Sequence, residues 1–169
     1  MGLPRKLKNF ATFVDGVNYM GETPEVTLPT LSRKMEEYRS GGMNGPVGID
    51  LGQEKMEAEI KAAGWQTDLL ARFGAPTHDA VMLRFAGAIQ ADDDAAVQAV
   101  EVVMRGRIQQ AKPDNAKAGD MTNMTYKYSL SYYKLTENGE VRVEIDLVNL
   151  VEIVDGDDNL AAVRTALGV

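Results

Sequence analysis

The stretch Met124–Leu150 reads MTYKYSLSYYKLTENGEVRVEIDLVNL, and its pattern decides the fold class. Apolar and polar residues alternate on both sides of Asn138-Gly139, a typical two-residue turn of a β-hairpin. We therefore expect strands over 124–136 and 140–154, joined by this turn. The apolar faces are predicted to carry Tyr126, Tyr128, Leu130 and Tyr132 in the first strand, and Val141, Val143, Ile145 and Leu147 in the second. The alternation slips at 148–150, which predicts a bulge or bend.

The same two-residue period recurs over 55–62, 81–89 and 100–108. Asp15-Gly16 predicts a further hairpin. The pattern favours a mainly β, antiparallel fold in one domain over residues 1–169. Two short helices are expected, over 67–73 and 158–167, and Asp157 or Asp158 is expected to cap the second. Residues 25–39 are predicted to form an extended arm, with a helix as the alternative. Residues 40–52 are predicted to form a glycine-rich connector.

The composition excludes several classes of function. The chain has 169 residues, no cysteine and a net charge of −7. The absence of cysteine excludes disulfides and thiolate metal sites, and the acidic balance disfavours tight binding of nucleic acid, which needs Lys and Arg at phosphates. We find no signal-peptide pattern and no apolar run long enough to span a membrane, so no membrane anchor is expected.

No motif predicts catalysis, a cofactor or a metal. The glycines of 41–52 lack the lysine of a phosphate-binding loop, and Pro46 follows Gly45 where a nucleotide fold would begin a helix. The stretch 155–159, DGDDN, lacks the glycine and glutamate that a calcium loop needs. The run 92–94 is typical of a solvated turn, and His78, the one histidine, has no nucleophile motif beside it. We expect a protein that is not an enzyme.

An ordered set of short motifs resembles the major tail tube protein of contractile-tailed bacteriophages and R-type tailocins. The motifs span nearly the whole chain: Pro4-Arg5-Lys6-Leu7, Val26-Thr27-Leu28-Pro29, Arg39-Ser40-Gly41-Gly42-Met43-Asn44, Leu83-Arg84-Phe85-Ala86-Gly87, Val100–Arg107, Tyr133-Lys134-Leu135, Glu144-Ile145-Asp146, Val154-Asp155-Gly156 and Leu167-Gly168. Each motif is weak alone, and the order of the set is specific.

The resemblance implies an antiparallel β-sandwich or barrel-like tail-tube fold with a short helix, and a structural subunit of an inner tail tube. Six copies would form a ring, and rings would stack into a hollow tube inside a sheath, conducting DNA or ions after contraction. A barrel of about 24 strands, spaced ~4.8 Å and tilted ~40°, has a backbone diameter of roughly 50 Å, which side chains narrow by about 10 Å. DNA would pass without tight binding, because an acidic channel repels phosphate. Two alternatives stay open: a hexameric tube protein of a type VI secretion system, and a small β-barrel ligand-binding domain.

The resemblance also implies partners and a place: further copies, the sheath protein, the baseplate or tube initiator, and the tail terminator, in a virion tail or tailocin particle assembled in the host cytoplasm. The predicted subunit-interface residues are Arg39, Gly41, Gly42, Met43, Asn44 and Val47. The predicted channel-facing residues are Glu57, Glu59 and Glu101.

Overall fold

The computed structural model describes residues 2–169 and confirms a mainly β, antiparallel fold with two short helices. The strands are β1 (Lys6–Val14), β2 (Val17–Asn18), β3 (Glu25–Thr27), β4 (Arg33–Tyr38), β5 (Val47–Gln53), β6 (Met56–Ala62), β7 (Val81–Gln90), β8 (Gln98–Pro113), β9 (Met124–Glu137), β10 (Glu140–Asp146), β11 (Val151–Val154) and β12 (Asp157–Asp158). The helices are α1 (Thr67–Leu70) and α2 (Ala161–Leu167).

The main sheet branches at β9. Its strands follow the order β12-β11-β10-β9-β8-β7-β1-β2. One edge of β9 pairs with β8 along most of its length, while the other edge pairs first with β6, over Met124–Leu130, and then with β10, over Tyr132–Glu137. β3 extends the branch by pairing with β6. The long strands β8 and β9 therefore belong to two layers at once.

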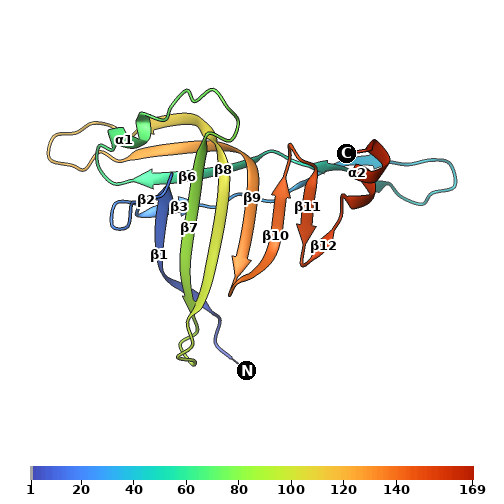
Figure 1. Cartoon of the computed structure of the whole chain (residues 1–169), viewed down its shortest axis with the longest axis horizontal. Coiled ribbons are helices and arrows are strands. Elements are labelled where there is room, and N and C mark those ends of the chain that lie inside the picture. Colours follow the sequence, from blue (N-terminus) through green and yellow to red (C-terminus); the bar gives the residue numbers. More distant parts are fainter. Residues whose placement is uncertain (1) are drawn as a thin grey trace.

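Figure 1 shows β8 and β9 turning from one layer into the other, so that β6 lies across the ends of β1 and β7. The register between β8 and β9 shifts at Arg105/Gly106 and again at Ile108/Gln110. Each shift leaves one residue unpaired, which bends a strand. The bends bring the two layers over each other in the near-orthogonal packing of a sandwich that approaches a barrel.

One apolar core fills the space between the layers, and its largest fully buried side chains include Tyr126, Tyr128, Met56, Ile60, Leu83, Met104 and Leu69. The unpaired Ser131 reverses the alternation of β9. Tyr133 is consequently buried, and Tyr132 lies on the opposite face, where its hydroxyl donates to Glu144 Oε1 at 2.9 Å. The prediction that Tyr132 faces the core was wrong, because a bulge changes which residues share a face.

Both predicted Xaa-Gly hairpin turns are confirmed. Asp15-Gly16 has φ angles of 48° and 81°, and Asn138-Gly139 has 50° and 82°, as a type I′ turn requires. The single strand predicted over 140–154 was wrong, because the chain reverses at 147–150 and β10 pairs with β11. The Asp146 carboxylate accepts the N–H groups of Val148 and Asn149, each at 3.1 Å, and so stabilises that turn.

Both helices are shorter than predicted. α1 ends at Leu70 instead of residue 73. α2 begins at Ala161 instead of residue 158, because Asp157 and Asp158 form a short strand that pairs with β11. Asp158 accepts the Leu160 N–H at 3.1 Å just before the helix. Gly168, with φ 75°, ends α2 as expected.

The segment predicted as a connector is half strand. Residues 47–53 form β5, which pairs with β4 in a separate two-stranded sheet. The helical alternative for 25–39 was therefore wrong, and the extended prediction holds. We call the hairpin Arg33–Gln53 the arm.

Candidate subunit interface and channel surface

The arm projects past α2, on the side of the molecule away from α1 (Figure 1). Residues opposite one another in an antiparallel pair share a face, and Tyr38 lies opposite Val47. Alternation along β5 adds Ile49 and Leu51 to that face. These four side chains, which we call the arm stripe, are each 45–55% exposed. A two-stranded hairpin is marginally stable alone, so a stripe left open marks a surface that a partner can cover.

The predicted interface residues lie at the far end of the arm. Arg39, Gly41, Gly42, Met43 and Asn44 form the tip, and Val47 begins β5 beside it. The tip turns tightly: the Met43 N–H donates to the Ser40 carbonyl at 3.2 Å, and Gly42 has φ 87°. The structure thus brings these residues together, and their contact with another subunit stays a prediction. The sequence reasoning missed Tyr38, Ile49 and Leu51, although the alternation Val47-x-Ile49-x-Leu51 signals a strand.

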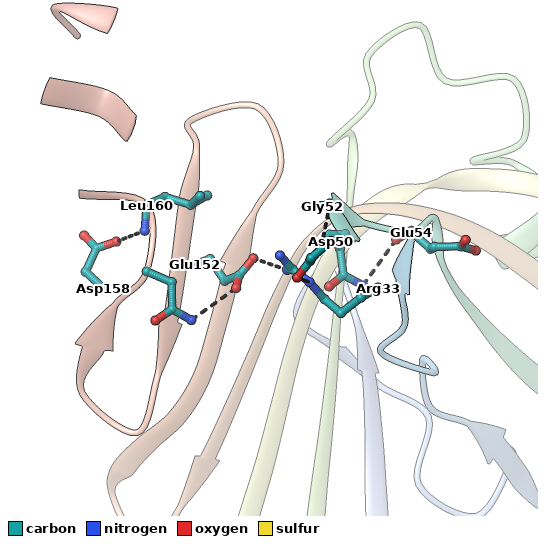
Figure 2. A network of polar contacts seen from close by, with 9 residues as sticks. Arg33, Asp50, Gly52, Glu54, Glu152, Asp158 and Leu160 are labelled. Atoms are coloured by element: carbon teal, nitrogen blue, oxygen red, sulfur yellow. Dashed lines mark hydrogen bonds and ion pairs between the residues drawn. The ribbon is translucent and has the colours of Figure 1, made fainter. Parts of the chain in front are cut away.

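Arg33 lies at the base of the arm, where three segments meet (Figure 2). Its Nε donates to Asp50 Oδ2 at 2.8 Å, and its Nη1 contacts Glu152 Oε2 of β11 at 2.5 Å. The hydrogen bonds to Asp50 and then Glu152 raise the pKa of the guanidinium. The hydrogen bond from Arg33, assisted by the Gly52 N–H, lowers the pKa of Asp50.

Glu57 and Glu59 lie on the face of β6 that points away from the core, since Met56, Ala58 and Ile60 between and beside them are buried. Glu57 forms ion pairs with Lys55 Nζ at 2.7 Å and with Lys127 Nζ at 2.9 Å. These two hydrogen bonds, Lys55 first, lower the pKa of Glu57.

Glu101 lies on the same outer face of the sheet. Ser129 of β9 pairs with Glu57 on one side and with Arg107 of β8 on the other. Arg107 and Glu101 are six residues apart along β8, and an even spacing keeps them on one face. Glu101 pairs with Arg84 Nη2 at 2.8 Å. All three predicted glutamates therefore point away from the core, Glu57 and Glu59 from the layer of β6 and Glu101 from the layer of β7, so the structure does not place Glu101 beside the other two. Their surroundings are mixed in charge, not acidic as expected, because basic partners face Glu57 and Glu101.

Other motifs belong to turns. Asp92 pairs with Lys8, and Asp93 accepts the Leu3 N–H at 2.8 Å, so this acidic run ties down the N-terminal segment. Among residues 2–169, no three His, Asp or Glu side chains group as metal ligands would. No helix in that range is long and apolar enough to cross a membrane.

The fold is that of contractile-system tube proteins. A chain of the sheath/tube terminator structure of the extracellular contractile injection system PVC superposes with a TM-score of 0.60 at 10% identity, covering 79% of this chain and 96% of that one. A chain of the PVC sheath–tube complex gives 0.59 at 10% identity, covering 79% and 91%. A chain of the anti-feeding prophage baseplate gives 0.50 at 8% identity, covering 80% and 97%.

The sequence matches the family described as Phage tail tube protein FII over residues 4–168, and the chain belongs to this family. It is 40% identical to the tail tube protein of Escherichia phage P2 over 172 aligned residues, covering all of both chains. It is also 40% identical to the major tail tube protein of Serratia phage KSP20 over 158 residues, covering 92% of this chain and 91% of that one. The protein is thus a structural tail tube subunit, a component of the virion tail, and not an enzyme, as the sequence predicted.

Proposed function

We propose that six copies of the chain form a ring, and that rings stack into a hollow tube through the arm stripe and the arm tip. The arm stripe carries this proposal, because Tyr38, Val47, Ile49 and Leu51 are each about half exposed and pack on no part of the main core. Full burial of such a side chain is worth about 1.5–3 kcal/mol. Covering the exposed half of all four therefore contributes roughly 3–6 kcal/mol per arm.

The outer face of β6, β8 and β9 lines the channel in this proposal. Glu57, Glu59 and Glu101 point outward from these strands, with lysine and arginine interspersed. Tight binding of DNA requires many lysine and arginine side chains that replace the counterions at its phosphates. A wall of mixed charge has no continuous row of such side chains. DNA or ions then move through without being held.

The same tube meets a sheath on its outside, a baseplate or initiator at one end and a terminator at the other. The similarity of the fold to chains of a sheath–tube complex and of a sheath/tube terminator structure supports this arrangement. Assembly takes place in the host cytoplasm, before the particle is released.

Electron microscopy of the purified protein over a range of concentrations tests the proposal. We expect six-fold rings or tubes of uniform diameter. The triple change Val47→Ser, Ile49→Ser, Leu51→Ser removes the apolar part of β5 and should abolish them. Val97→Ser, which alters an exposed valine outside the arm, is the control. Monomers at every concentration would contradict the proposal.

A further inference from the structure

The base of the arm is joined to the body of the molecule by a polar contact between Arg33 and Glu152. We infer that the ion pair between Arg33 and Glu152 fixes the direction of the arm and so positions the arm stripe for a neighbouring copy. The inference deepens the proposed function and rests on it, because a fixed direction matters only if the arm meets another copy.

The arm has few attachments. Within residues 2–169, Arg33–Glu152 is the one hydrogen bond or ion pair that joins the arm to another strand or helix. β4 and β5 pair only with each other. Figure 2 shows Arg33 between Asp50 on its own hairpin and Glu152 on β11. A two-stranded hairpin held at one end pivots about its base unless a side-chain contact prevents it.

The body side of this contact is held firmly. The Glu152 side chain is 12% exposed. Asn159 donates through Nδ2 to Glu152 Oε1 at 3.2 Å, and the Asn159 N–H donates to the Glu152 carbonyl at 2.9 Å. Glu152 is therefore an ordered acceptor, and a shielded carboxylate left without its cation is costly. This cost keeps the arm in the one direction that satisfies both residues.

The arm side is equally ordered. The register of β4 and β5 shifts between Arg33 and Met35, and Gly52 has φ 114° at this bulge. Asp50 accepts the Gly52 N–H through Oδ1 at 2.8 Å and Arg33 through Oδ2. The planar guanidinium thus reaches two carboxylates in fixed directions, which a lysine ammonium does not do. Arg33 is a positioning residue: it acts on assembly through the orientation of the arm.

The absence of cysteine in the chain allows a direct test. Spin labels introduced by Ser40→Cys at the arm tip and Glu140→Cys at the β9–β10 turn report the tip-to-body distance in the unassembled protein. We expect a narrow distance distribution that becomes at least twofold wider with Glu152→Ala or with Arg33→Gln. Arg33→Gln changes a residue of the projecting arm and so keeps the test valid if Glu152→Ala misfolds. Lys8→Gln breaks a surface ion pair with Asp92, in which neither the arm nor a labelled position takes part, and should leave the distribution unchanged.

Assembly is measured on the same variants without labels. We expect the protein concentration needed for tubes to rise at least tenfold in Glu152→Ala and Arg33→Gln, with less than a twofold change in Lys8→Gln. If the wild-type protein never assembles, the proposed function fails, while the distance measurement still reports on the contact. If the wild-type protein assembles and both variants keep wild-type distances, the inference is overturned. Wider distances with unchanged assembly would equally overturn the positioning role.

Discussion

Gly106 of β8 lies directly against Ser129 of β9, because a β-carbon placed on Gly106 would stand 2.2 Å from the Ser129 carbonyl oxygen. The next atoms it would meet, at 2.9 and 3.0 Å, also belong to the backbone, so no side chain can move aside. The register shift at Arg105/Gly106 falls at the same place. The two strands thus approach closely where they turn between layers, and only glycine permits this approach.

Replacing Gly106 with alanine should therefore destabilise the fold by about 3 kcal/mol or more, since backbone atoms must separate at the bend. Gly41→Ala is the matched control, because a β-carbon at Gly41 meets nothing within 4 Å. Urea unfolding of the two variants measures the difference. A Gly106→Ala protein within about 1 kcal/mol of wild type would show that the bend relaxes easily.

The sequence predicts the straight parts of this fold well and the bends poorly. The alternation of apolar and polar residues predicts β6, β7 and the first half of β9, because one face of each strand is buried. It fails at Ser131, where one unpaired residue moves Tyr133 into the core in place of Tyr132. Bulges follow from how two distant strands pair, and that information is not local.

The arm shows a second limit. Gly48 and Gly52 made 47–53 resemble a connector, because glycine weakens strands. The structure has a use for both residues. Gly48 gives the Met35 side chain room, since a β-carbon there would lie 3.0 Å from Met35 Cε, and Gly52 supplies the positive φ of the bulge. The tip residues were located from the sequence, whereas the Arg33–Glu152 contact joins positions too far apart in the chain to be read from any pattern.

The tip glycines give the second prediction. Changing Gly41 and Gly42 to valine should impair tube formation more than folding, because the tip lies outside the core and Gly42 needs φ 87°. Gly119→Val is the control: Gly119 has the same φ and the same open surroundings in another loop. Electron microscopy and urea unfolding are compared for both proteins. Normal tubes from the Gly41→Val/Gly42→Val protein would exclude the tip from the interface.

A charge in the arm stripe gives the third prediction. Val47→Asp should raise the concentration required for assembly by at least about tenfold, because burying an unpaired carboxylate costs more than the 1.4 kcal/mol that a tenfold change represents. Val97→Asp places the same charge on a valine of similar exposure, 64% against 55%, and should assemble normally. Sedimentation at increasing protein concentration provides the measurement. Equal assembly of the two variants would mean that no partner covers the stripe.

Tyr132 predicts a pH dependence. Burial, and then the hydrogen bond to Glu144, raises the pKa of its phenol to about 12, against about 10 in an unfolded chain. Folding therefore favours the protonated phenol. This contribution to stability is complete below about pH 10 and is lost as the pH rises through about 12. Ultraviolet titration of the folded protein should show that some tyrosine ionises only above about pH 10. The amount of this tyrosine should be smaller in Tyr132→Phe, and none should remain in urea. Ionisation of all six tyrosines near pH 10 in the folded protein would refute it.

The channel wall gives the last prediction. Glu59→Cys and Glu101→Cys each place the one thiol of the chain on the outer face of the main sheet. In an assembled tube, a small maleimide should reach both thiols. A maleimide carrying a long polymer should react at least about tenfold more slowly, because it must enter from the tube ends into a bore of roughly 40 Å. The same variants unfolded in urea should react with both reagents alike. Rapid reaction of either thiol with the polymer reagent in intact tubes would place that residue outside the channel, and the wall would then have to be sought on another face of the sheet.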